Sequence, residues 1–269
     1  MERNQPYRQP RRKRRRSCLG RFLTFLIICL VLFFGISMFF QVNEIQVLGE
    51  TRYTVQQVID ASGLALGDHL FFVNSEAAER EIQTGLPYID RAELRRRFPN
   101  RLEITVSETF SVAQIQIAGG YLVLDKNAKI LEWQDEAPGT HLVKIIGLPE
   151  PVSPQPGDIL DLGGDGQDCL RYLQNILGTA TTLGLINRIS YINMTDLHAP
   201  IFLYDDRFTV RLGPNLDLYH KMDMLVGIVA YYAEADVSGV IDLSLDRPIF
   251  RPHEADAPHA PDAHPYYGE

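Results

Sequence analysis

The chain has 269 residues, of which 45% are hydrophobic and 22% are charged, and its formal net charge is −8. Twenty Gly and sixteen Pro are ordinary for a globular chain, which excludes collagen-like and fully disordered proteins. Three Cys are too few for a disulfide scaffold, so the folded part must be stabilised by hydrophobic cores.

The charge is distributed unevenly along the chain. Residues 1–21 carry nine of the 26 Lys and Arg against one of the 34 Asp and Glu, a local charge of +8. The other residues therefore hold 17 basic and 33 acidic side chains, a charge of −16. The densest basic cluster consists of Arg11, Arg12, Lys13, Arg14, Arg15 and Arg16. Such a cluster is typical of nucleic-acid contacts, nuclear localisation or membrane topology, and the neighbouring sequence decides between them.

The stretch after this cluster is strongly apolar. Residues 22–40, FLTFLIICLVLFFGISMFF, contain 16 apolar residues among 19 and no charged one. At ~1.5 Å per residue, a helix of this length spans about 28 Å, close to the hydrocarbon thickness of a bilayer. The sequence therefore predicts a single transmembrane helix at 22–40. By the positive-inside rule, residues 1–21 are then a basic cytoplasmic tail and the rest of the chain is extracytoplasmic.

Two other interpretations of the N-terminus fit less well. A cleaved signal peptide has an apolar core of ~7–15 residues, shorter than this stretch. The small residues Gly35 and Ser37 also lie inside the apolar stretch, where cleavage is not expected. Beside a membrane span, the basic cluster is better explained by topology and by attraction to anionic lipids than by nucleic acid. We therefore expect a permanent anchor in the plasma membrane and no nucleic-acid partner.

Residues 41–110 combine strand and helix patterns. In chain order we expect a strand, two helices and two strands, at residues 42–47, 55–63, 75–85, 89–98 and 102–106. Thr54 and Gln57 form a capping box ahead of the first helix, and Asn74 or Ser75 caps the second. The last two strands alternate apolar and polar residues around a Pro-Asn turn. This order predicts one small α+β domain.

Residues 111–250 are rich in short strands and form a second unit. Strands are expected at residues 112–117, 121–124, 129–133, 142–146, 201–204, 208–212 and 239–245. Amphipathic helices are expected at 165–183 and after Asn215, which would cap the second of them. We predict a mostly antiparallel β domain with two helices. Residues 251–269 contain four Pro and no Leu, Ile or Val, so we expect a disordered tail.

Several segments carry a family resemblance. Residues 87–108 read PYIDRAELRRRFPNRLEITVSE and are similar to the pattern P-x-V-x-x-A-x-V-x-R-x-W-P-x-x-L-x-I-x-V-x-E. Upstream, residues 45–49 (IQVLG) and 63–67 (GLALG) resemble the signatures I-x-V-x-G and G-L-x-x-G. These motifs belong to the POTRA domain of the bacterial cell-division family FtsQ/DivIB. Residues 108–113, ETFSVA, depart from the usual continuation E-R-x-P-V-A. Weaker likenesses extend the resemblance to about residues 10–250.

The resemblance has functional implications. It implies a bitopic membrane scaffold of the division septum that binds the division proteins FtsB/DivIC and FtsL through its β domain. It implies no cofactor, no metal and no small-molecule substrate. The alternatives are a POTRA-type polypeptide-binding module of another exported complex, or an exported enzyme of unrecognised type.

Catalytic motifs are absent from the sequence: it has no G-x-S-x-G, H-E-x-x-H, C-x-x-C or Walker loop. Asp161, Asp165 and Gly166 match positions 1, 5 and 6 of a calcium loop. Position 12, however, is Tyr172 in place of the bidentate Glu. We expect a polar turn leading into a helix. Cys169 lacks the local signature of a nucleophile and is expected to be buried. The sequence therefore favours a protein that is not an enzyme.

Strand addition is the mode of binding that the sequence favours. A sheet that ends in a C-terminal strand leaves an edge, whose N–H and C=O groups can pair with another chain. The candidate segment, at the edge or next to it, consists of Val240, Ile241, Asp242, Leu243, Ser244 and Leu245. The alternative is an interior strand whose apolar face is simply core. On the binding hypothesis, Asp or Pro at position 241 or 243 abolishes partner binding and leaves the domain folded.

Overall fold

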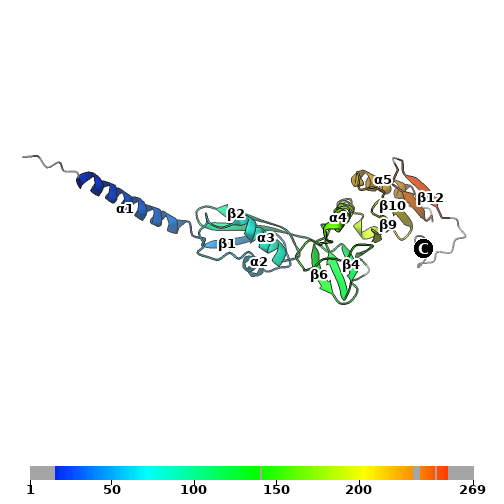
Figure 1. The fold of residues 1–269 in the computed structure, drawn as a ribbon, viewed down its shortest axis with the longest axis horizontal. Helices are drawn as coiled ribbons and strands as arrows, with labels where there is room; N and C mark the ends of the chain where they lie inside the picture. The colour runs from blue at the N-terminus through cyan, green and yellow to red at the C-terminus, as the bar shows by residue number, and fades with distance from the viewer. Residues whose placement is uncertain (1–15, 140, 233–236, 246, 254–269) are drawn as a thin grey trace, which may run out of the picture.

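The computed structural model describes residues 16–139, 141–232, 237–245 and 247–253 (Figure 1). A long helix, α1 (Arg16–Phe39), precedes two β-sheets. The predicted span at 22–40 falls within α1 except for its last residue. Arg16 begins α1, whereas the other five residues of the basic cluster lie outside the described residues. In the part of the chain that the structure describes, no helix combines the length and the apolar character needed to cross a bilayer.

The first sheet has three strands and two covering helices, which we call the three-stranded unit. Its elements are β1 (Glu44–Leu48), α2 (Val55–Ala61), α3 (Ser75–Gly85), β2 (Ile89–Arg97) and β3 (Arg101–Glu108). The strand order is β1-β3-β2, with β1 parallel and β2 antiparallel to β3. The alternating apolar residues of β2 and β3 face the helices and form the core with Val58 and Ile82. The predicted order of strand, helix, helix, strand, strand is confirmed.

Local capping explains where these helices begin. The Thr54 hydroxyl accepts from the Gln57 N–H at 3.3 Å, and the Gln57 side chain accepts from the Thr54 N–H at 2.8 Å, so the predicted capping box is confirmed. Asn74 caps α3 by accepting from the Ala77 N–H at 3.2 Å. Each bond satisfies a donor that the first helical turn leaves without a partner.

Among the described residues the second sheet has nine strands, which with their helices we call the nine-stranded unit. Its strands are β4 (Ala113–Ile117), β5 (Gly120–Leu124), β6 (Ile130–Gln134), β7 (Val143–Ile146), β8 (Ile189–Asn193), β9 (Ile201–Tyr204), β10 (Phe208–Arg211), β11 (Gly239–Asp242) and β12 (Ile249–Pro252). Their order in the sheet is β12-β11-β10-β9-β8-β7-β4-β5-β6. Five of the eight pairings among the described strands are antiparallel, so the mostly antiparallel sheet is as predicted.

Two helices, α4 (Gln167–Thr182) and α5 (Leu218–Tyr231), contribute to the core of the nine-stranded unit. Leu173 and Ile176 of α4 and Met222 and Leu225 of α5 are fully buried with the strand residues of this core. The prediction that Asn215 caps α5 is wrong. The helix begins at Leu218, the residue before it is Asp217, and the Asp217 side chain makes no capping bond. The strands β8 and β12 were not expected. β12 also continues two residues past the boundary expected at residue 250.

A small apolar cluster joins the two units. Tyr88, the residue before β2, packs with Val123, Leu131 and Leu142 of the nine-stranded unit, and Tyr53 lies against them. The Tyr88 hydroxyl donates to the Glu132 carboxylate on β6. The units are therefore in direct contact through side chains that lie far apart in the sequence.

Polar contacts surround this cluster. The Lys129 side chain is buried and its ammonium donates to two backbone carbonyls of the three-stranded unit, those of Gln83 and Ile89, the latter at 2.9 Å. Burial lowers the pKa of Lys129, opposed by nearby carboxylates. Lys126 forms an ion pair with Asp90 at 2.9 Å. The junction thus combines apolar packing with directional bonds, which fixes the orientation of the units.

Candidate protein-binding site

The predicted segment 240–245 forms β11 and the residues that follow it. β11 pairs with β10 in parallel on one side and with β12 in antiparallel fashion on the other, so it is the second strand from the edge. Ile241 and Leu243 are completely buried in the core of the nine-stranded unit. Their side chains therefore face the interior of the domain and offer no surface to a partner.

The polar residues of this segment close the strand. The Asp242 carboxylate accepts from the Ser244 N–H at 3.0 Å and from the Ser244 hydroxyl at 2.5 Å, a local turn that ends β11. Val240 is half-buried, and Leu245, after the turn, is 50% exposed. Because Ile241 and Leu243 are buried, we expect an Asp at either position to place a charge in the core and to unfold the domain, so such variants would not test partner binding alone.

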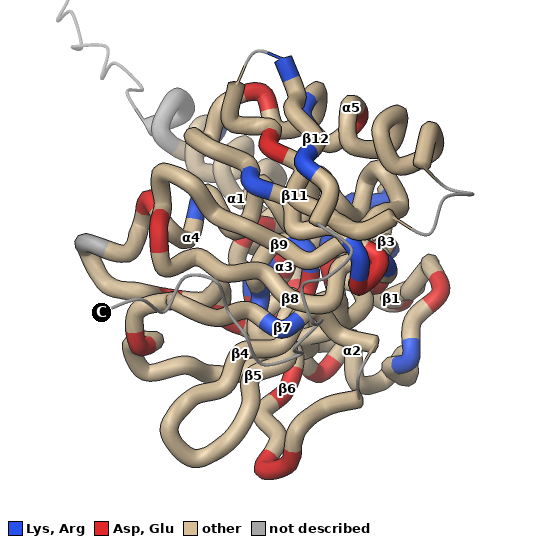
Figure 2. Tube along the Cα trace, turned by 90° about the vertical axis from the view of Figure 1, so that its right-hand side faces the viewer, with Lys and Arg blue, Asp and Glu red and all other residues tan. Residues whose placement is uncertain are grey.

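The edge of the sheet is β12. Among the described strands, β12 pairs with β11 alone. Phe250 anchors it, with ring centroids 6.0 Å from Phe208 and 4.6 Å from Tyr232. Ile249 is 37% exposed, and Arg251 is exposed beside it. Figure 2 shows basic positions next to β12, in a chain whose body is acidic.

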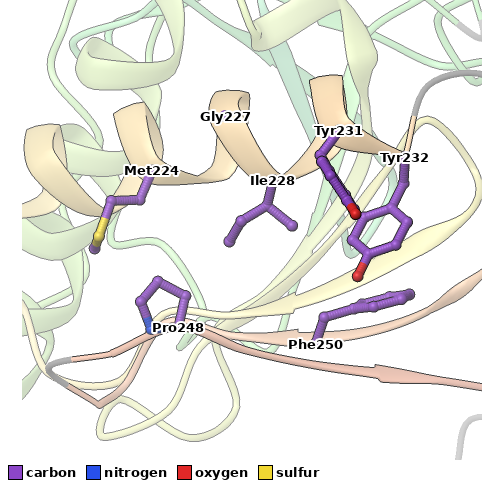
Figure 3. Close-up of a pocket in the computed structure, with 7 residues that line it drawn as sticks. All are labelled: Met224, Gly227, Ile228, Tyr231, Tyr232, Pro248 and Phe250. Carbon is purple, nitrogen blue, oxygen red and sulfur yellow. The ribbon is translucent and has the colours of Figure 1, made fainter.

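A groove of about 560 Å³ runs between α5 and the β12 edge (Figure 3). It is lined by Met224, Gly227, Ile228, Tyr231, Tyr232, Pro248 and Phe250. Three of the lining side chains are aromatic, and one of them, Tyr231, is 82% exposed. Gly227 has no side chain and therefore leaves the helix side of the groove open. No atom lies within 4 Å of the position that a Cβ would occupy. An edge strand beside an aromatic groove is a surface suited to an extended peptide.

Sequence reasoning did not find the groove residues. The signal was available in part, since the adjacent Tyr231 and Tyr232 end an otherwise aliphatic helix pattern and Phe250 follows Pro248 closely. What the sequence could not reveal is that the end of α5 lies over β12, because this depends on the parallel pairing of β10 with β11.

The base of α5 is held by the half-buried cation of Lys221. Lys221 donates to the carbonyl oxygens of Leu212 at 2.8 Å and Pro214 at 2.9 Å, so it closes the loop between β10 and α5. Burial lowers the pKa of Lys221, and the nearby Asp217 carboxylate opposes this shift. The role of Lys221 is to position α5, and with it one wall of the groove.

The residues considered for chemistry have structural roles. Burial raises the pKa of the Cys169 thiol, which disfavours the reactive thiolate. The Asp161 carboxylate accepts from the Gly163 N–H at 2.9 Å in the turn before α4, and the Tyr172 hydroxyl donates to the Gly213 carbonyl at 2.6 Å. Within the described ranges, no group of three His, Cys, Asp or Glu side chains is placed to hold a metal ion.

Residues 40–109 match the family described as POTRA domain, FtsQ-type. The match covers α2, α3 and β1–β3, so the three-stranded unit is a POTRA domain of the FtsQ type.

Relatives that match most of the chain are cell division proteins. The chain is 26% identical over 217 residues to the cell division protein DivIB of Clostridium acetobutylicum, covering 77% of this chain and 80% of that protein. It is 29% identical over 207 residues to the cell division protein FtsQ of Anaeromyxobacter sp., covering 76% and 67%. To DivIB of Clostridium botulinum it is 21% identical over 242 residues, covering 89% and 92%. The resemblance to FtsQ/DivIB is confirmed, and these relatives support a role in cell division.

A solved structure also matches part of the chain. It is the major extracytoplasmic domain of the trans isomer of DivIB from Geobacillus stearothermophilus, with 14% identity and a TM-score of 0.31. The alignment covers 48% of this chain and 98% of that domain.

Proposed function

We propose that this chain is a non-enzymatic scaffold of the division septum that binds other division proteins, FtsB/DivIC and FtsL, through the β12 edge and the groove beside it. The observation that carries the proposal is the edge strand beside a groove with aromatic side chains in its lining. A strand added to β12 would gain backbone hydrogen bonds, and its alternate side chains would fill the groove.

Membrane anchoring is part of the same proposal. The sequence supports it through the uncharged stretch 22–40 and the basic cluster before it. The side chains of Phe22, Phe25 and Val31 on α1 are all more than 60% exposed. Exposed apolar side chains of this size are unfavourable in water and favourable in a lipid bilayer. The POTRA domain and the nine-stranded unit would then lie outside the cytoplasm, next to the site of septum synthesis.

Binding is tested by a matched pair of substitutions on α5. Tyr231→Ala removes an 82% exposed ring from the groove, whereas Tyr219→Ala removes a 58% exposed ring outside it. In co-purification with the FtsB/DivIC protein of the same organism, we expect Tyr231→Ala to lower the yield about tenfold or more, the usual effect of losing an aromatic hot spot. Tyr219→Ala should not change it. Equal binding by both variants contradicts this site.

Localisation is tested separately. A fluorescent fusion of the full chain in dividing cells should form bands at mid-cell, and a uniform membrane signal contradicts the septal role. The Tyr231→Ala fusion separates recruitment to mid-cell from partner binding. If it still forms bands but no longer co-purifies the partner, recruitment does not depend on this binding site.

A further inference from the structure

An exposed aromatic cluster surrounds the point where α1 meets the POTRA domain. Phe40 follows the last residue of α1, and its ring centroid lies 4.9 Å from that of Phe71 and 6.3 Å from that of Phe98. Phe71 and Phe98 are themselves 5.6 Å apart. Phe72 extends the cluster from the same loop as Phe71. We call Phe40, Phe71, Phe72 and Phe98 the aromatic collar.

The collar is far more exposed than a core cluster. Phe72 is 83% exposed, Phe98 63% and Phe71 52%, and none of the three belongs to a hydrophobic core of the described residues. Leu66, on the loop that leads to Phe71, is 67% exposed. Soluble proteins rarely expose several large apolar side chains side by side, and such a patch marks a surface that is covered in use.

Backbone bonds hold the collar against the end of α1. The Leu70 N–H donates to the Phe40 carbonyl at 2.8 Å, and the Val42 N–H donates to the Asp68 carbonyl at 2.8 Å. The Asn43 N–H donates to the Asn100 carbonyl at 2.9 Å, which holds the β2–β3 turn at the same place. The loop and the turn that carry the collar are therefore fixed to the chain where it leaves α1.

Arginines flank the collar. Residues 91–101 contain five Arg and one Glu, a local charge of +4 in a body whose overall charge is −16. Arg97 pairs with Glu103 at 2.9 Å and Arg101 with Glu44 at 3.0 Å. The Arg97 and Arg101 side chains are 56% and 59% exposed, so each guanidinium group can also reach phosphate oxygens from its solvent side.

We propose that the collar and its arginines form a contact surface for the headgroup region of an anionic phospholipid bilayer. This rests on the proposed membrane anchoring by residues 22–40. If the bilayer ends near Phe40, the rings of Phe71 and Phe98, 4.9 Å and 6.3 Å from that of Phe40, lie at headgroup depth, where aromatic side chains are favoured. The arginines then face lipid phosphates, which attract basic side chains at this depth. The contact holds the POTRA domain against the membrane instead of leaving it free on a tether.

The test uses fluorescence quenching of the full chain in vesicles of phosphatidylcholine and phosphatidylglycerol. Trp133 is the chain's single tryptophan, lies on β6 and is 44% exposed, so the unmodified chain is a control far from the collar. The probe is Phe72→Trp combined with Trp133→Phe. With bromine atoms on the upper part of the lipid acyl chains, we expect emission from the probe to fall by about half, since the ring is at headgroup depth. Emission from Trp133 should not change.

The outcomes separate the collar from the anchor. Flotation of the vesicles reports whether the chain is anchored. A chain that floats but shows no quenching of the probe overturns the collar contact and leaves the anchor intact. A chain that does not float overturns both. A second probe, Phe98→Trp with Trp133→Phe, gives an independent answer from the other loop of the collar, and equal circular dichroism spectra show that both variants fold. These vesicles contain no other protein, so quenching also excludes a partner's membrane segment as the required occupant.

Discussion

The phenol of Tyr88 offers a quantitative test of the junction between the POTRA domain and the nine-stranded unit. Its hydroxyl donates to the Glu132 carboxylate, and the Arg52 guanidinium lies 3.5 Å from the centre of its ring. Burial, reinforced by Glu132, raises the pKa of Tyr88 to about 12 from its ordinary value of 10.0. The perturbation is Tyr88→Phe, which keeps the ring on Arg52 and removes only the hydroxyl.

The expected magnitude follows from the shift. Because the pKa is higher in the folded chain, the folded state keeps the phenolic proton longer than the unfolded state. The stabilisation is complete below pH 10 and is lost as the pH rises toward 12. For pKa values of 10 and 12, the loss between pH 9 and pH 11 is about 1.3 kcal/mol. At neutral pH, losing a hydrogen bond to a charged group costs about 1.5–3 kcal/mol.

The assay is urea unfolding of the full chain and of Tyr88→Phe, followed by circular dichroism at pH 7, 9 and 11. We expect the difference in free energy of unfolding between the two proteins to shrink from pH 9 to pH 11, because only the unmodified chain loses the Tyr88 contribution. Tyr219→Phe, at an exposed tyrosine on α5, controls for loss of a phenol. A difference that stays constant across this range refutes the hydrogen bond between Tyr88 and Glu132.

Three further predictions concern single buried positions, all measured by urea unfolding. Lys129→Ala removes the ammonium that donates to the carbonyls of Gln83 and Ile89 and should cost about 2–4 kcal/mol; a loss below about 0.5 kcal/mol contradicts the contact. Gly157→Ala should cost about 2 kcal/mol or more, since φ is +98° and a Cβ would lie 1.9 Å from the Thr84 carbonyl oxygen. The matched control Gly178→Ala, in α4 with open space around it, should be neutral or stabilising. Leu243→Asp should unfold the nine-stranded unit, and a folded variant contradicts the burial of this side chain.

The POTRA domain could be predicted from the sequence because its signals are local. The capping box at Thr54 and Gln57 and the cap at Asn74 are bonds between residues three apart. The alternation in β2 and β3 also survives in the burial pattern, because one face of this sheet is covered by helices and the other is not. Local geometry and burial agree there, so the pattern is read without ambiguity.

The edge of the nine-stranded unit could not be predicted in the same way. β12 has no alternating burial pattern, since Phe250 is more buried than its three neighbours in the strand, which are all exposed, and the strand ends in a proline. For β11 the alternation showed which residues share a face, but not that this face is covered by α4 and α5. The sequence misplaced the start of α5. Asp217, the residue before the helix, has φ +50° and makes no side-chain capping bond, so the cap pattern used for prediction does not apply there.

The order of strands in the second sheet sets a mechanical path through the molecule. β6, which bonds to Tyr88 through Glu132, lies at one end of the sheet, and β12 lies at the other. A force that pulls β12 away from the POTRA domain therefore acts across the strands. It passes in turn through each hydrogen-bonded strand pair between β12 and β6. The shortest of these, β4 with β7 and β7 with β8, have three residue pairs each. Under tension the sheet should tear first beside β7, well away from the groove and from the joint with the POTRA domain.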